Sequence, residues 1–243
     1  FLLFGTHTGA LSTQGLLMLG PILAFCAALT FALNNVSARR GVLSGTAAQA
    51  TIVTLPLGAL ITFAVVCIFG LLPQLNVFDF RGYVLLSLAG ILHFAIGRYC
   101  NYRAVKAIGS VLSGPVQEMS IIWTVALAML LLGETVTVQQ TIGILLIMFA
   151  PTISMRRKRP TGKKEGVRDF EPKYKEGYIF AGLSALSYGS SPLLVAAAMP
   201  EMADLSAGIV SCMISYVAAA LTVIVVILPF RGQFEHIRSI ERE

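Results

Sequence analysis

An acidic residue, Glu118, stands inside the long apolar segment that follows Lys106. It is the ninth residue of a predicted membrane span starting at Ser110, which places it roughly 12 Å into the bilayer at 1.5 Å per residue. A charged side chain at this depth costs about 2.5–3.5 kcal/mol, so such residues usually face a cavity or a partner. We therefore predict that Glu118 contacts a substrate or couples transport to protons. The alternative is a protonated side chain that only packs.

Polar residues accompany Glu118 on the same predicted helix. Ser113, Gln117, Ser120 and Thr124 follow one another at intervals of four, three and four residues, which puts them on one helical face. We predict Gln117, Ser120 and Thr124 as cavity-lining candidates. The alternative is that this stripe only forms hydrogen bonds to a neighbouring helix.

The pair Gly114-Pro115 precedes this stripe. A proline inside a helix removes one hydrogen-bond donor, and the helix kinks, while glycine allows a neighbouring helix or ligand to approach closely. We therefore predict a kink at these two residues.

His93 is a candidate partner for Glu118. It lies 13 residues before the predicted turn at Lys106, and Glu118 lies 12 residues after that turn, so both have a similar depth. A histidine–glutamate pair in low dielectric could exchange a proton. A neutral histidine bonded to a backbone or hydroxyl group is equally consistent with the sequence. Arg98, nearer the predicted cytoplasmic end, is expected to extend toward the interface.

Two further spans carry polar residues whose role the sequence leaves open between substrate contact and helix packing. The first has Thr30, Asn34 and Ser37 on one face, with Asn35 adjacent. The sixth has Tyr188 and Ser191, followed by Pro192 as a predicted kink. The chain has no HExxH, GxSxG or CxxC motif. We therefore expect no metal site, no cofactor and no enzymatic activity, with an intramembrane enzyme as a remote alternative.

The composition indicates how these residues are positioned. The chain is 56% hydrophobic and 12% charged, with a mean hydropathy of +0.79, whereas soluble domains carry about 25% charged residues. Runs of about 20 apolar residues cross a bilayer as helices, and these runs are too continuous for a membrane β-barrel. We predict an all-α polytopic membrane protein, a helical bundle with seven spans at 15–38, 47–72, 83–103, 110–132, 137–154, 177–199 and 207–229.

Basic residues concentrate in one connection, residues 155–176. Nine of the 18 lysines and arginines lie between Arg156 and Lys175. Their position favours a membrane-orientation signal over nucleic-acid binding, so this linker is predicted to be cytoplasmic and the N-terminus external.

The chain also shows a weak internal repeat. Glycines at positions 15 and 20 recur as Gly177 and Gly182, and the triplet FRG occurs at 80–82 and 230–232. We predict a first five-helix repeat at 1–154, the linker at 155–176, and two helices of an incomplete second repeat at 177–243. About three helices of a complete second copy would be missing, and the absence of an initial methionine favours a fragment.

The segment from Asn101 to Pro151 resembles the end of an EamA domain of the drug/metabolite transporter superfamily. The matching features are an aromatic-Arg-Ala step at 102–104, small residues at 109–110, Pro115, a Leu-Leu-Gly-Glu turn at 131–134 and a Gly-x-Leu-Leu-Ile sequence from Gly143. The resemblance implies a ten-helix fold of two inverted five-helix repeats. It also implies both termini inside, which disagrees with the charge distribution.

The resemblance implies a secondary transporter in the plasma (inner) membrane that moves a small polar or amphipathic metabolite by alternating access. Its expected partners are the lipid bilayer and this metabolite, with no nucleic acid, and a homodimer is one option for its assembly. The competing hypothesis is a truncated scaffold or accessory subunit that does not transport.

Overall fold

The computed structural model describes residues 13–133, 135–156, 172–200 and 204–227. All regular elements in these ranges are helical, and six helices are long and apolar enough to cross a membrane. The prediction of an all-α polytopic membrane protein is therefore confirmed. The C-terminal FRG triplet and most of the basic linker lie outside the described residues.

The helices follow the predicted order, with several spans composed of two or three consecutive elements. The membrane-crossing candidates are α1 (Thr13–Ser44), α2 (Ala47–Ile68), α3–η2–α4 (Phe80–Gly90, Ile91–Gly97, Arg98–Ile108), α5–α6–η3 (Ser110–Gln117, Met119–Leu127, Ala128–Leu132), α8 (Tyr174–Ala198) and α9 (Leu205–Ile227). A short 3₁₀ helix, η1 (Leu72–Val77), joins α2 to α3. The predicted fifth span is a helix, α7 (Val138–Arg156), but it is not among the six candidates.

Glycines make the tight connections between these helices. Gly109 has a φ of 81° between α4 and α5, and Gly133 has a φ of 67° at the end of η3. Residues with a Cβ rarely adopt these positive φ values, so glycine allows each helix to end sharply.

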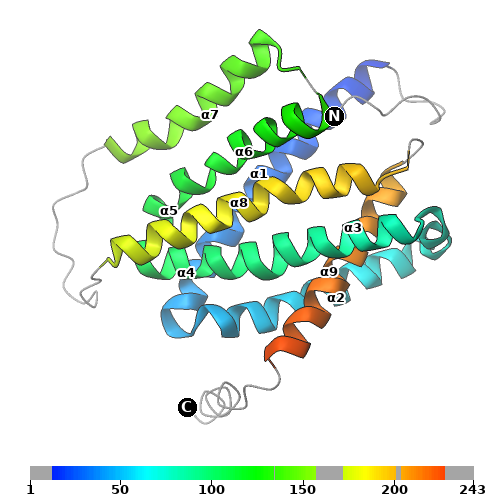
Figure 1. Cartoon of the computed structure of the whole chain (residues 1–243), viewed down its shortest axis with the longest axis horizontal. Helices are drawn as coiled ribbons and strands as arrows, with labels where there is room; N and C mark the ends of the chain where they lie inside the picture. Colours follow the sequence, from blue (N-terminus) through cyan, green and yellow to red (C-terminus); the bar gives the residue numbers. More distant parts are fainter. Residues whose placement is uncertain (1–12, 134, 157–171, 201–203, 228–243) are drawn as a thin grey trace.

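Helix α8 lies at the centre of the bundle. It packs on one side against α3, η2 and α4, and on the other against α5 and α6 (Figure 1). Glycine permits close contact on both sides: a Cβ at Gly97 would come within 2.8 Å of the Tyr188 ring, and one at Gly189 within 2.6 Å of the Ser120 carbonyl oxygen. The serines and small residues of α8 therefore act as helix-packing positions.

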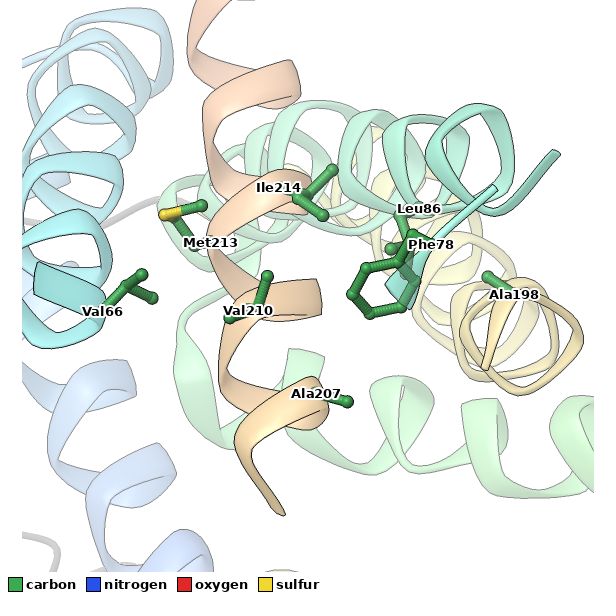
Figure 2. Packing of buried hydrophobic residues seen from close by; sticks show 8 residues of the cluster. All are labelled: Val66, Phe78, Leu86, Ala198, Ala207, Val210, Met213 and Ile214. Carbon is green, nitrogen blue, oxygen red and sulfur yellow. The ribbon is translucent and has the colours of Figure 1, made fainter. Parts of the chain in front are cut away.

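Helix α9 crosses α2 and α3 and forms the second half of the interior (Figure 1). Its side chains contribute to a buried apolar cluster that also draws on α2, α3 and α8 (Figure 2): Val66, Phe78, Leu86, Ala198, Ala207, Val210, Met213 and Ile214. A Cβ at Gly90 would overlap the backbone of Ser215, and the Ser215 hydroxyl donates to the Leu86 carbonyl over 2.9 Å. The backbones of α3 and α9 are therefore in direct contact at Gly90 and Ser215.

Helix α1 lies at the margin of the bundle. It contacts α4 and, less extensively, α2 and α5, and most of its described side chains are exposed. Phe25 is 71% exposed and Leu33 is 59% exposed. An apolar surface of this extent suits lipid or further helices.

Candidate functional site

The helix that carries Glu118 breaks at this residue. Helix α5 ends at Gln117 and α6 begins at Met119. The Ile121 amide donates to the Glu118 carbonyl over 3.1 Å, a contact one residue shorter than the α-helical pattern. Pro115, within the last turn of α5, has no amide to donate to the preceding turn.

The side chain of Glu118 is half-buried at this break. Its carboxylate forms no hydrogen bond or ion pair with any residue that the structure describes. A Cβ added at Gly114 would meet nothing within 4 Å, so no described helix approaches that glycine. An acid without a partner and an open helix face therefore occur within one turn of each other.

The polar stripe beside Glu118 points into the bundle and connects three helices. Gln117 is buried and donates through Nε2 to Oδ1 of Asn101 on α4, over 2.6 Å. Asn101 in turn donates through Nδ2 to the Tyr188 hydroxyl on α8, at the long distance of 3.5 Å. Ser113, only 1% exposed, has an Oγ atom without a hydrogen-bond partner among the described residues. The stripe thus contains both satisfied and unsatisfied buried groups.

Further along the stripe, α6 is bonded directly to α8. The Thr124 hydroxyl lies 2.8 Å from the Gly189 carbonyl oxygen and 2.9 Å from that of Ser120. Trp123 donates from its indole to the Ser190 hydroxyl over 2.9 Å, a contact that the sequence analysis did not anticipate. In this structure Thr124 and the Ser120 backbone thus take part in helix packing.

His93 has a hydroxyl partner. Its Nδ1 lies 2.7 Å from the Ser191 Oγ, and its ring centroid lies 4.6 Å from that of Tyr188. No hydrogen bond or ion pair between described residues joins His93 to Glu118. Of the two arrangements left open by the sequence, the structure contains the histidine bonded to a hydroxyl group. His93 belongs to η2, a π-helical segment of the kind often found at functional sites.

Arg98, predicted to extend toward the interface, is half-buried and contacts α9. It donates from Nη2 to the Tyr216 hydroxyl over 2.8 Å. Its Cζ lies 5.2 Å from the centre of the Phe94 ring and 5.4 Å from that of Tyr216. A hydrogen bond and two cation–π contacts hold the guanidinium between aromatic rings. The sequence contains no signal for this contact because Tyr216 lies 118 positions away.

The remaining predicted residues occupy two different environments. Asn34 on α1 is exposed, whereas the Oδ1 atom of Asn35 is buried and has no partner among the described residues. Helix α8 continues without interruption through Pro192, unlike the helix break near Pro115. Glu118 and the Asn101–Gln117 pair therefore lie on or between helices that pack against α8, and the His93–Ser191 pair joins η2 to α8 itself, while Asn34 is exposed on α1.

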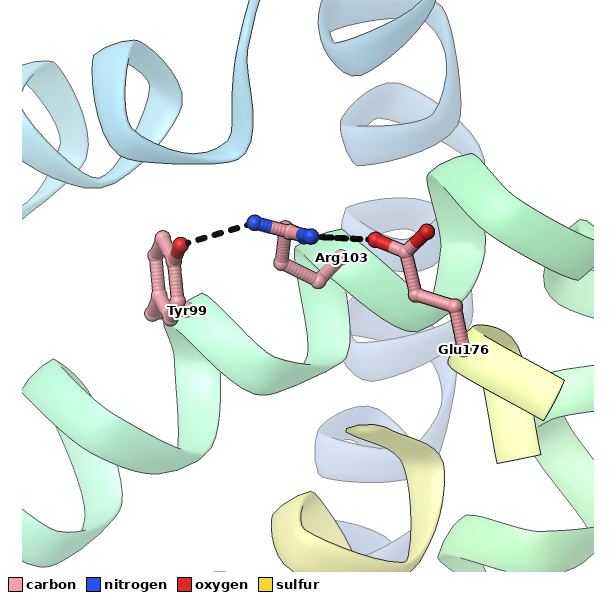
Figure 3. A network of polar contacts seen from close by, with 3 residues as sticks. All are labelled: Tyr99, Arg103 and Glu176. Atoms are coloured by element: carbon pink, nitrogen blue, oxygen red, sulfur yellow. Dashed lines mark hydrogen bonds and ion pairs between the residues drawn. The ribbon is translucent and has the colours of Figure 1, made fainter. Parts of the chain in front are cut away.

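A polar network joins α4 to the start of α8 (Figure 3). Arg103 in the middle of α4 forms an ion pair with Glu176 at the start of α8, with a distance of 3.0 Å from Nε to Oε1. The guanidinium also donates to the Tyr99 hydroxyl over 3.2 Å and lies over the Phe180 ring. The sequence analysis did not identify this network, because its two charged residues come from separate predicted repeats.

No group of three or more histidine, cysteine or acidic side chains within the described ranges has an arrangement that could hold a metal ion.

The sequence model of the EamA-like transporter family matches residues 18–156. This match covers more than half of the 243 residues, and the chain belongs to that family, which is part of the drug/metabolite transporter superfamily. The matched region contains α1 to α7 apart from the first few residues of α1. No curated protein and no solved structure matches the chain significantly.

Proposed function

We propose that this chain, as a member of the EamA-like transporter family, forms the transporting part of a secondary transporter that moves a small polar or amphipathic metabolite by alternating access. The family and the six apolar helices support this function. The arrangement of polar groups around α8 supports the location of the transport path. We place the protein in the plasma membrane, with the basic linker in the cytoplasm.

The observation that carries the proposal is the environment of Glu118. An ionisable residue within a span is a functional candidate, because placing a charged side chain in the membrane costs free energy. Glu118 stands where its helix is irregular, half-buried and without a described partner. It can therefore gain or lose a proton without breaking an ion pair. We assign it the role of coupling group.

The polar groups near Glu118 would form the substrate-facing wall. In the structure they bond to one another, as in the Gln117–Asn101 contact of 2.6 Å and the His93–Ser191 contact of 2.7 Å. A polar substrate can replace such contacts with its own donors and acceptors. The unpartnered oxygens of Ser113 and Asn35 add acceptor capacity in α5 and α1.

A transport assay on Glu118→Gln tests this assignment. The full-length protein is reconstituted in proteoliposomes, and exchange of a compound that stabilises the protein is measured at several pH values. If Glu118 carries the coupled proton, wild-type exchange changes with pH over the range in which the carboxyl titrates. The glutamine variant, which cannot titrate, exchanges at a rate independent of pH.

Asp79→Asn is the matched control. Asp79 caps α3 by accepting from the Gly82 amide over 2.7 Å, and asparagine is an equally good cap. This variant makes the same acid-to-amide change at the end of a helix and keeps the wild-type pH profile. An unchanged pH profile in Glu118→Gln would remove Glu118 from the mechanism.

A further inference from the structure

A cavity of about 430 Å³ opens at the end of the bundle that carries the Arg103–Glu176 ion pair. It is formed where three helices meet, and its wall contains residues from the first turn of α2 with its N-cap, from α4, and from the first turn of α8 with its N-cap. The lining residues are Thr46, Ala47, Ala48, Tyr99, Arg103, Lys106, Ala107, Lys173 and Glu176.

The position of the cavity coincides with the ends of three candidate spans. One span begins at Ala47, one ends at Ile108 and one begins at Tyr174. The Lys173 amide donates to the Ala107 carbonyl over 2.9 Å, which holds the start of α8 against the end of α4. The cavity therefore lies at the level of the lipid headgroups, within reach of both phospholipids and soluble ions.

The lining has an excess of positive charge. It contains three cations, Arg103, Lys106 and Lys173, and one acid, Glu176, so its formal charge is +3 − 1 = +2. The acid is already paired with Arg103. The two lysines therefore remain without an acidic partner among the described residues.

Both lysines have hydrogen-bond donors to spare. The Lys106 ammonium makes one bond, to the Gly45 carbonyl over 2.5 Å, and an ammonium group has three donors. The Lys173 ammonium makes no hydrogen bond or ion pair to a described residue. A further cation outside the lining, Arg39 of α1, lies against Gly109, the residue that ends α4.

We propose that this cavity binds an anionic phosphate group, with Lys106 and Lys173 as its ligands and the paired Arg103 as the fixed positive wall. The group comes either from an anionic phospholipid headgroup or from a soluble phosphate. Basic pockets between helices at the membrane surface suit both sources, because the charge is neutralised and the phosphate oxygens accept several hydrogen bonds. This inference is independent of the proposed transport function.

Two binding measurements distinguish the sources. The full chain is placed in nanodiscs of phosphatidylcholine with and without phosphatidylglycerol, and bound lipid is counted by native mass spectrometry. In a second experiment the protein in neutral detergent is titrated with inorganic phosphate, and thermal stabilisation is recorded. Enrichment of phosphatidylglycerol identifies a lipid site, and saturable stabilisation by phosphate identifies a soluble ligand.

Charge variants connect either result to the cavity. Lys106→Gln and Lys173→Gln are each expected to weaken binding about fivefold, the effect of one basic residue near a charged surface. Lys173→Gln removes no described hydrogen bond, so it remains informative if Lys106→Gln folds poorly.

Lys175→Gln is the control, because Lys175 lies on the same first turn of α8 but does not line this cavity. It keeps the wild-type affinity. Equal weakening by all three variants would show a diffuse surface effect, and the absence of binding in both experiments would also overturn the proposal.

Discussion

Gln117 shows how a single side chain can join three helices inside an apolar bundle. Its amide donates to Asn101, which donates to Tyr188, so α5, α4 and α8 share one polar contact line. Buried amides of this kind cost energy when they lose a partner. Their contribution in a membrane is smaller than in water-soluble cores, because the reference state also finds partners.

We predict a coupling of about 1 kcal/mol between Gln117 and Asn101, within the range measured for hydrogen bonds between membrane helices. Gln117→Leu and Asn101→Leu each lower the free energy of unfolding, since each removes the hydrogen bond between the two amides. The double variant loses less unfolding free energy than the sum of the losses in the two single variants. This double-mutant cycle is measured by unfolding each variant in sodium dodecyl sulfate and monitoring the circular dichroism. Strictly additive losses would contradict the hydrogen bond between Gln117 and Asn101.

The individual site residues were only partly predictable. The spacing of Ser113, Gln117 and Thr124 correctly placed them on a polar face, because helical periodicity is a local property. The partners Asn101, Gly189 and Ser191 depend on how helices pack and are not encoded in local spacing. For the same reason the contacts of Arg98 with Tyr216 were not predicted, because Tyr216 lies on a helix late in the chain.

At the scale of elements, the contact between α3 and α9 depends on the absence of a side chain at Gly90. A Cβ there would overlap the Ser215 backbone, and backbone cannot move aside as a flexible side chain can. Overpacking in a close-packed interior costs about 1–3 kcal/mol.

We therefore expect Gly90→Val to lower the melting temperature of the purified protein markedly, measured by thermal unfolding in detergent. Gly114→Ala is the matched control, because open space surrounds that position and alanine favours helix by up to about 1 kcal/mol. The Gly114→Ala protein is expected to have the same melting temperature as the wild type or a higher one. A Gly90→Val protein as stable as the wild type would contradict the close α3–α9 contact.

The elements themselves were largely predictable because long apolar runs and terminal glycines are strong local signals. The segment predicted as 110–132 is the span Ser110–Leu132 in the structure. The third span is longer than predicted, Phe80–Ile108 instead of 83–103, because its last turns also carry buried apolar residues such as Val105 and Ile108. The π-helical segments η2 and η3 were not predicted, since their extra residue per turn has no sequence signature of its own.

At the scale of the whole molecule, α1 combines an apolar exposed surface with a polar one. Thr30, Asn34 and Ser37 are all exposed in the structure, and the Thr30 hydroxyl bonds only to carbonyls of its own helix. An exposed asparagine inside a span is costly in lipid, so this side of α1 suits a cavity or a further helix. The two-repeat organisation predicted from the sequence would supply such a partner surface.

Cysteine labelling of α1 tests this orientation. In a background without the four native cysteines, Asn34→Cys is expected to react at least about tenfold faster with a hydrophilic maleimide than Leu33→Cys, because the reactive thiolate forms only in contact with water. Leu33 is the control because it is adjacent and 59% exposed. Equal rates in proteoliposomes would place both residues in lipid and contradict a cavity beside α1.

A measurement of proton flux tests most directly whether Glu118 couples transport to protons, as proposed above. Amino acids, nucleosides and sugars are first screened for compounds that raise the melting temperature of the full-length protein. The most effective compound is then tested in proteoliposomes containing a pH-sensitive dye. The account predicts that adding it produces proton flux in the wild type and none in Glu118→Gln. Equal proton flux in both proteins, or uptake of the compound without proton flux, would contradict it.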